Sequence, residues 1–318
     1  MNKQNFALIG AAGYIAPRHM IAIKETGNEL IAAYDKFDSV GILDRYFPEA
    51  FFFTEFERFD RHIDKLKRNT QKDGVDFISV CSPNYLHDSH IRFGLRSGCN
   101  VICEKPIVLN PWNIDGLLEM EKETGKKVFT VLQLRIHPNV QKLREMISLS
   151  RDKKFEIDLT YITSRGKWYM QSWKGEQNKS GGIATNIGIH FFDLLNYLFG
   201  DVQLNQLHYS APDKASGYLE YEKARVRWFL SVDKNDLPAE QKQAGKTVFR
   251  SMTMDGSEMD FSDSFTDLHT SIYAGILGGN GFGLEDAKPA VATVADIRTM
   301  APIGLKGEYH PHLNKIKL

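Results

Sequence analysis

A lysine stands at the end of an apolar segment, Val101-Ile102-Cys103-Glu104-Lys105-Pro106. β-Branched apolar residues followed by proline indicate a buried strand that stops there, because proline cannot continue a hydrogen-bonded ladder. In a parallel α/β sheet, Lys105 would lie at the edge where ligands bind. An amine held partly out of water has a lowered pKa and can transfer protons. The alternative, from these six residues alone, is a surface lysine after a strand.

Asn186 and His190 are four residues apart in a mostly apolar stretch, 183–199, which predicts a helix that ends before Gly200. The two side chains therefore share one helix face. Gly188 removes a side chain beside His190, so that another group can approach closely. A buried histidine on such a helix can also be a core residue with satisfied hydrogen bonds. The pattern favours a functional His190.

Cations alternate with large aromatic residues in the loop before that helix, beginning with Arg165, Lys167 and Trp168. This composition suits a ligand with a phosphate or carboxylate at one end and a flat ring at the other, such as a nucleotide-linked sugar. The alternative is a loop that packs its tryptophans against a second subunit. If the ligand is such a sugar, we expect it to contact Arg135, Arg165, Lys167, Asn186 and His190.

A glycine turn follows the first predicted strand, 6–10, and precedes a predicted helix. Gly10 and Gly13 allow close backbone approach, and Asp35 ends the next strand 22 residues after Gly13. This order predicts a dinucleotide site, in which a carboxylate at Asp35 favours NAD over NADP. The turn is one residue longer than the usual fingerprint, so a purely structural turn is the alternative.

A polar corner, Ser82-Pro83-Asn84, follows the predicted strand 75–81, and His87 lies in the helix after it. Because parallel strands end at one edge of a sheet, we expect this corner near the cofactor. Helix capping by Asn84 is the alternative. The residues expected to contact NAD are Gly10, Gly13, Tyr14, Ile15, Asp35, Ser82, Pro83, Asn84, His87, Glu104 and Lys105.

The predicted elements divide the chain into two domains. Strands alternate with helices in 1–130, which predicts an α/β Rossmann domain with a parallel sheet. Alternating runs in 131–318 predict an α+β domain with a large, open, mostly antiparallel sheet. The second domain has predicted strands at 155–162, 205–209, 216–220, 224–232 and 247–254, and helices at 138–149, 183–199, 265–277 and 284–300.

Composition excludes several classes of function. The 318 residues include 40 basic and 40 acidic side chains, and zero net charge argues against nucleic-acid or anionic-membrane binding. No run approaches the roughly 18 apolar residues of a membrane span, and no signal-peptide core is seen, so we expect a cytoplasmic protein. The cysteines, Cys81, Cys99 and Cys103, form no CxxC pair. We expect them in the core and expect no metal site.

Glu104-Lys105-Pro106, the Ser82-Pro83-Asn84 corner with His87, and the glycine-rich His190 helix together resemble the Gfo/Idh/MocA oxidoreductases, over essentially the whole chain. The strings "GKWYMQSWK", "SGGIATNIGIHFFDLL", "RVRWFLSVD" and "FTDLHTSIY" are similar to one branch, which acts on UDP-linked N-acetylglucosaminuronic acid in bacterial O-antigen and lipopolysaccharide synthesis. The resemblance implies a Rossmann domain, a homo-oligomer, often a tetramer, assembled through the second sheet, and a cis Lys105-Pro106 bond.

For activity, the resemblance implies NAD-dependent oxidation of the sugar's 3-hydroxyl, with Lys105 and His190 beside the nicotinamide and 2-oxoglutarate reoxidising the cofactor. Many members carry an aspartate four residues before that histidine. Asn186 stands there in this chain and cannot act as an acid or base, so proton transfer is left to Lys105 and His190. A dehydrogenase of another sugar or polyol, or a non-catalytic sensing protein, are the alternatives.

Overall fold

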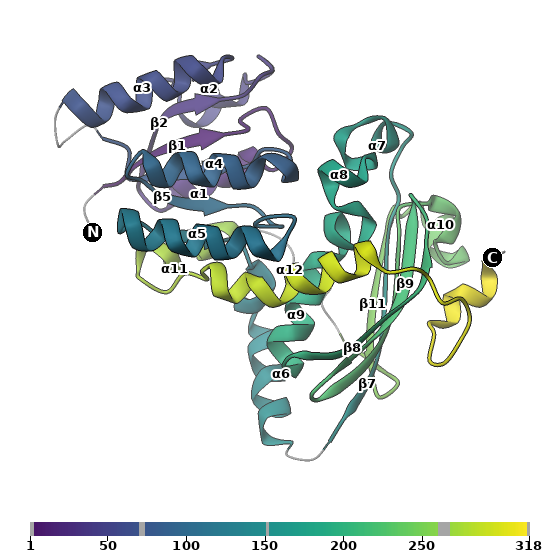
Figure 1. The fold of residues 1–318 in the computed structure, drawn as a ribbon. Coiled ribbons are helices and arrows are strands. Elements are labelled where there is room, and N and C mark those ends of the chain that lie inside the picture. Colours follow the sequence, from purple (N-terminus) through teal and green to yellow (C-terminus); the bar gives the residue numbers. More distant parts are fainter. Residues whose placement is uncertain (1–2, 70–73, 151–152, 260–267, 317–318) are drawn as a thin grey trace. The chain divides into compact units, whose positions relative to one another are not determined.

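The computed structural model describes all residues except 1–2, 70–73, 151–152, 260–267 and 317–318. By its internal packing the chain forms two units (Figure 1). The first comprises Met1–Ile136 together with Phe265–Lys288, and the second comprises His137–Ser264 together with Pro289–Leu318. Within the described part of the chain, no helix is long and apolar enough to cross a membrane.

Six parallel strands form the sheet of the first unit, in the order β3-β2-β1-β4-β5-β6. They are β1 (Asn5–Ile9), β2 (Glu29–Tyr34), β3 (Phe51–Phe53), β4 (Phe77–Val80), β5 (Asn100–Cys103) and β6 (Val128–Thr130). The strand order reverses between β1 and β4, where sheets of this type bind ligands at the carboxyl ends. The predicted parallel sheet is confirmed; β3 was missed because it has only three residues.

Helices cover both faces of this sheet. They are α1 (Ala16–Glu25), α2 (Ile42–Tyr46), α3 (Phe56–Asn69), η1 (Asn84–Leu86), α4 (His87–Arg96), α5 (Pro111–Thr124), η2 (Gln133–Ile136) and α11 (Leu268–Leu277). On one face α4 packs beside α5, and on the other α1 packs beside α11 (Figure 1). Met20 of α1 and Tyr273 of α11 share a core with Phe6 of β1. The chain thus returns to its first unit late in the sequence.

The second unit contains a mixed sheet in the order β12-β11-β7-β10-β9-β8. Its strands are β7 (Phe155–Thr163), β8 (Val202–Ser210), β9 (Lys214–Tyr221), β10 (Ala224–Ser231), β11 (Val248–Met254) and β12 (Ser257–Glu258). Every neighbouring pair is antiparallel except β7 and β10. The predicted α+β domain with a mostly antiparallel sheet is therefore confirmed.

The remaining helices are α6 (Pro138–Leu149), α7 (Trp168–Gln171), η3 (Trp173–Gly175), α8 (Gln177–Ser180), η4 (Ala184–Gly188), α9 (Ile189–Phe199), η5 (Lys234–Asp236), α10 (Ala239–Gln243), α12 (Leu284–Thr299) and η6 (Pro311–Lys315). α12 begins in the first unit and continues in the second. The predicted helix 265–277 is confirmed from Leu268 onward, and 265–267 lie outside the described residues.

The predicted helix 183–199 is not uniform, because its first turn, η4, is a π-helix. A Cβ on Gly188 would lie 2.5 Å from Cδ1 of Leu230 and 2.9 Å from Cε2 of Phe192. The turn therefore lies tightly against β10, and a larger residue at position 188 would have to displace the side chains of Leu230 and Phe192. Such π-helical turns often occur at functional sites, and this one carries Asn186.

Candidate active site

The glycine turn between β1 and α1 brings backbone segments into close contact. Gly10 has a φ of +93°, and a Cβ there would lie 2.6 Å from the carbonyl carbon of Cys81 and 2.8 Å from the amide nitrogen of Ser82. The amide of Gly10 donates to the carbonyl oxygen of Tyr34 at 2.8 Å. Only glycine combines this dihedral angle with this contact. Two of the predicted cofactor segments are therefore neighbours.

The helix after this turn begins with no side-chain cap from the described residues. Ile15 is the N-cap residue of α1, and Pro17 lies in the first turn. The side chain of Tyr14 is 93% exposed. A helix start whose N–H groups are uncapped binds anions such as a diphosphate.

The carboxylate of Asp35 is fixed beside the same turn. Its Oδ2 accepts a hydrogen bond from the amide of Ala12 at 3.0 Å, and its Oδ1 accepts from the amide of Phe37 at 3.0 Å. β2 ends at Tyr34, so Asp35 directly follows the strand, at the carboxyl edge of the sheet. A carboxylate in this position can accept hydrogen bonds from ribose hydroxyls.

His87 joins the segments that follow β4 and β5. Its Nε2 is 2.7 Å from the carbonyl oxygen of Ser82, and its Nδ1 is 2.6 Å from the carbonyl oxygen of Pro106. Burial lowers the pKa of His87, whereas the two carbonyls raise it. Neither Asn84 nor His87 provides a side-chain cap for η1 or α4 in the described chain. The capping alternative is therefore not supported, and both side chains are buried.

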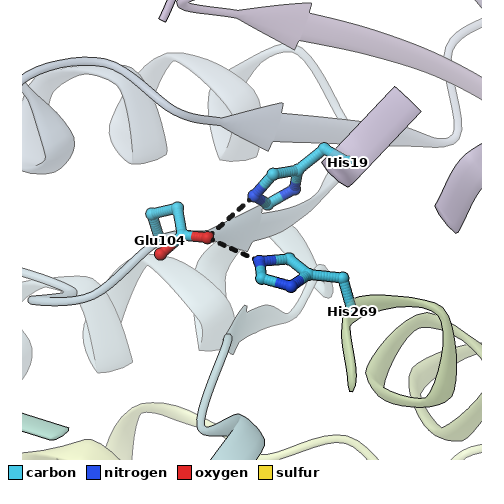
Figure 2. A group of neighbouring side chains, drawn as sticks. All are labelled: His19, Glu104 and His269. Carbon is cyan, nitrogen blue, oxygen red and sulfur yellow. Dashed lines mark hydrogen bonds and ion pairs between the residues drawn. The ribbon is translucent and has the colours of Figure 1, made fainter. Parts of the chain in front are cut away.

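Glu104 points into the interior of the first unit, toward two histidines (Figure 2). Its Oε1 accepts hydrogen bonds from Nε2 of His19 and Nε2 of His269, both at 2.9 Å. Its Oε2 accepts from the backbone amide of Lys105 at 3.2 Å. His19 lies on α1 and His269 on α11, and both are buried. The Lys105-Pro106 bond is cis, as the resemblance implied.

Burial alone would raise the pKa of Glu104, but the hydrogen bonds from His19 and His269 lower it well below its usual value. Burial lowers the pKa of His19, against the effect of the carboxylate. The centre of the cluster is thus a carboxylate beside a neutral His19. Although no metal site was expected, the potential ligand atoms of His19, Glu104 and His269 lie within 4.8 Å of one another. Hydrogen bonds account for the contacts of the carboxylate with both rings.

Buried histidines predict that the first unit loses stability in acid. Burial lowers the pKa of His90 from 6.5 to about 4. At a pH between these two pKa values, His90 binds a proton in the unfolded chain but not in the folded chain. The folded state therefore loses stability as the pH falls through this range. For His90 alone the loss between pH 7 and pH 5 is about 2 kcal/mol. Urea unfolding at both pH values should show a correspondingly smaller loss for His90→Gln; an equal loss would contradict this.

In the second unit, Tyr169 links the loop after β7 to η4. Tyr169 is buried, and its hydroxyl accepts a hydrogen bond from Nδ2 of Asn186. Burial raises the pKa of Tyr169, while Asn186 and Arg165 act in the opposite direction. Arg165 and Lys167 are exposed, and Trp168 is 52% exposed. Three of the loop's candidate ligand-binding side chains therefore remain at the surface, and Arg165 and Trp168 lie near Tyr169.

Two other predicted site residues, Arg135 and His190, lie in environments different from those described above. Arg135 is buried in the first unit, where Nη1 lies 3.1 Å from Oδ1 of Asp286 and Nη2 donates to the carbonyl oxygen of Asp286 at 2.6 Å. Its guanidinium also lies over the ring of Phe282. His190 is half-buried in the first turn of α9. Arg135 thus stabilises the start of α12. The predicted cofactor residues of the first unit, in contrast, lie together around one edge of the sheet.

Three further residues, His19, His269 and Tyr273, were not among the predicted site residues. His19 is at a buried position of α1, in the string "GYIAPRHM", and the other two lie in the string "FTDLHTSIY". The string "FTDLHTSIY" contributed to the resemblance to a known family. Nothing in them states that α11 packs beside α1, so the cluster could be recognised only in the fold.

Comparison with known proteins identifies the family. Residues 4–132 match the GFO/IDH/MocA oxidoreductase family model of the NAD-binding Rossmann fold, and residues 145–243 match that family's C-terminal alpha/beta domain. The chain belongs to the GFO/IDH/MocA oxidoreductase family. This family member is 48% identical to the WlbA (WbpB) dehydrogenase from Thermus thermophilus solved with NAD and alpha-ketoglutarate, with a TM-score of 0.93 over 96% of this chain and 98% of that chain.

The same Thermus dehydrogenase solved with NAD and UDP-GlcNAcA gives 48% identity and a TM-score of 0.92, over 97% of this GFO/IDH/MocA protein and 99% of that chain. Curated relatives match over shorter stretches. D-glucoside 3-dehydrogenase of Escherichia coli is 31% identical over 128 residues, which are 39% of this chain and 36% of that protein. YteT, a putative oxidoreductase of Bacillus subtilis, is 26% identical over 58% of this chain and 44% of its own length. The chain thus spans less than half of these two curated relatives.

Proposed function

We propose that the protein is an NAD-dependent dehydrogenase that oxidises the 3-hydroxyl of UDP-N-acetylglucosaminuronic acid to a ketone. The observation that carries this proposal is 48% identity, over 97% of the chain, with a Thermus dehydrogenase solved with NAD and UDP-GlcNAcA. Identity at this level extends through both units and supports a shared substrate class as well as a shared fold. The choice of carbon 3 rests on the resemblance of the second-domain strings.

The geometry of the first unit fits NAD. Gly10 and Gly13, with Tyr14 and Ile15 at the start of α1, would hold the diphosphate, and Asp35 would bind a ribose. The bound cofactor would accept a hydride at carbon 4 of its nicotinamide. The other residues that we assign to its binding are Ser82, Pro83, Asn84 and His87. Lys105 would lie beside the nicotinamide, and Glu104 faces the interior of the first unit.

Loss of hydride from carbon 3 requires removal of the hydroxyl proton. We assign this proton to the amine of Lys105, and His190 would hold or relay it. Asn186 offers an amide in place of a carboxylate and takes no part in proton transfer. Its hydrogen bond to Tyr169 supports a role in orienting the sugar.

The sugar carboxylate and the diphosphate require cationic partners. Arg165 and Lys167 are exposed cations in the loop after β7, and Arg165 lies near Tyr169. A guanidinium can bind a carboxylate through two parallel hydrogen bonds. We therefore assign the carboxylate to Arg165 and a phosphate to Lys167. We leave Arg135 out, because its guanidinium is bonded to Asp286.

The proposal includes a second substrate and a cellular setting. 2-Oxoglutarate would take the hydride from the reduced cofactor, together with a proton, and become 2-hydroxyglutarate. The Thermus complex with NAD and alpha-ketoglutarate supports this step. The resemblance supports a homotetramer that serves O-antigen or lipopolysaccharide synthesis.

The test is to mix the purified protein with NAD and UDP-N-acetylglucosaminuronic acid and to follow reduced-nicotinamide absorbance. We expect a burst without 2-oxoglutarate and continued product formation with it. UDP-N-acetylglucosamine, which lacks the carboxylate, and UDP-glucuronic acid, which lacks the acetamido group, should react poorly. If a protein shown to bind NAD gives no signal with the uronic acid under either condition, the substrate assignment is wrong.

A further inference from the structure

We infer that Glu104 is a positioning residue for Lys105, and that it acts through a buried hydrogen-bond network with His19 and His269. This inference rests on the proposed function, because it takes Lys105 as the base. Glu104 immediately precedes Lys105, after the last residue of β5. Its side chain fixes the backbone from which the lysine side chain extends.

The Glu104 carboxylate accepts three N–H groups at once. Oε1 accepts from the rings of His19 and His269, each at 2.9 Å, and Oε2 accepts from the amide of Lys105 at 3.2 Å. A buried carboxylate is destabilising unless such bonds satisfy it. An amide could not replace it, because an amide has one acceptor oxygen and its nitrogen would face an N–H group. The site therefore selects glutamate by chemistry as well as by size.

The network continues from His19 to a second strand. Nδ1 of His19 is 2.7 Å from the hydroxyl of Tyr273, which is 2.7 Å from the hydroxyl of Ser79 on β4. One proton assignment satisfies these contacts: Ser79 donates to Tyr273, Tyr273 donates to His19, and His19 donates to Glu104. Burial raises the pKa of Tyr273 well above its usual value, so this hydroxyl keeps its proton. The network thereby joins β4, α1 and α11 to the end of β5.

The backbone around Lys105 is held from both sides. The amide of Glu104 donates to the carbonyl oxygen of Val80 at 3.0 Å, in line with the β4–β5 ladder. The Pro106 carbonyl contacts the His87 ring. The network adds the bond to the amide of Lys105 and links it to α1, the helix that follows the glycine turn. An error of about 1 Å in the placement of a reacting group can reduce the rate about 10²-fold.

Part of this support comes from outside the ranges that match the family models. Those ranges are 4–132 and 145–243, whereas His269 and Tyr273 lie on α11. Tyr273 also packs in the core with Phe6. The α11 segment, which returns from the second half of the sequence, thus acts on Lys105 through Glu104.

A zinc ion would use the same three side chains differently. Zinc binds histidine nitrogens at about 2.0–2.1 Å and requires their lone pairs, so Nε2 of His19 and Nε2 of His269 could no longer donate protons. The observed contacts of both atoms with Glu104 are at hydrogen-bond distance. A metal analysis of the purified protein should find no stoichiometric metal; stoichiometric zinc would overturn the network.

The main test is Glu104→Gln in the full chain. We expect kcat to fall about tenfold or more, with KM for the nucleotide sugar within about twofold, because the base is misplaced and the substrate contacts remain. Hydrogen–deuterium exchange should become faster in peptides covering 104–107. Glu121→Gln is the matched control: Glu121 is a buried glutamate of the same unit that accepts from the amide of Val128 at 2.7 Å. It should lower Tm and leave kcat and exchange at 104–107 unchanged.

Tyr273→Phe provides a second variant that keeps the core volume. Removing its hydroxyl leaves His19 without a partner at Nδ1, so a smaller fall in kcat is expected. The double variant with Glu104→Gln should lose no more than Glu104→Gln alone, since both act through one network. If the fold losses in kcat of the two single variants multiply in the double variant, the two residues act independently and this expectation is wrong.

The outcomes separate this inference from the proposed function. If the wild-type protein does not oxidise the nucleotide sugar, the proposed function fails, and the exchange measurement still decides whether Glu104 fixes the Lys105 backbone. If Glu104→Gln keeps wild-type exchange at 104–107, the inference is wrong, whatever the turnover. The inference is also wrong if kcat falls in proportion to the loss of Tm in both Glu104→Gln and Glu121→Gln. Loss of stability alone would then account for the slower turnover.

Discussion

Lys105→Met is expected to bind NAD normally and to lose turnover by about 10² to 10⁴-fold, the usual contribution of a positioned acid or base. Methionine has a similar length and no titratable group, so it removes the proton acceptor with little change in volume. The backbone at this position is held by Glu104, and that contact does not involve the lysine side chain. The loss should therefore appear in kcat, measured with saturating NAD and nucleotide sugar.

Two further variants separate the base from a simple positive charge. Lys105→Arg keeps the charge, but a guanidinium stays protonated at neutral pH and cannot accept the hydroxyl proton, so its turnover should also be low. Lys122→Met removes an exposed lysine from α5 and should leave kcat unchanged. Near-normal turnover in Lys105→Met would remove Lys105 from the mechanism. Recovery in Lys105→Arg would reduce its role to electrostatics.

Most of the fold could be predicted from local patterns, because both sheets have strong sequence signals. Buried parallel strands such as 101–103 are uniformly apolar, and half-exposed strands such as 155–163 alternate. The parallel pairing of β7 with β10 could not be predicted, since alternation is the same in either direction. The π-helical turn at 184–188 also has no local signal. Its Gly188 packs closely against Leu230 of β10, and this contact exists only in the folded sheet.

The candidate site likewise contains residues that the sequence predicts and residues that only the fold reveals. Residues at strand ends, such as Asp35 and Lys105, are found from sequence because the strand itself predicts their location. His269 is different, since it reaches Glu104 only because α11 packs beside α1, and that packing involves residues more than two hundred positions apart. Glu104 was expected to contact the cofactor. Its inward hydrogen bonds indicate a supporting role that a motif alone does not reveal.

Gly10→Ala is expected to destabilise the first unit by roughly 2–5 kcal/mol and to weaken NAD binding strongly. The φ of +93° is strained for alanine, and the new Cβ would lie 2.6–2.8 Å from backbone atoms of Cys81 and Ser82. Backbone atoms cannot move aside as a flexible side chain can. β1 and the end of β4 would have to separate at the point where the glycine turn meets the Ser82 corner. Urea unfolding and NAD titration would measure the two effects.

Gly27→Ala is the control that separates backbone strain from steric contact. Gly27 has a φ of +78°, and a Cβ there would meet no atom of the described structure within 4 Å. It should therefore cost only the strain of the dihedral angle, about 1–2 kcal/mol, and leave NAD affinity unchanged. If Gly10→Ala were no more destabilising than Gly27→Ala and bound NAD equally well, the glycine turn would be a flexible loop. The dinucleotide site would then have to be built from Asp35 and the Ser82 corner alone.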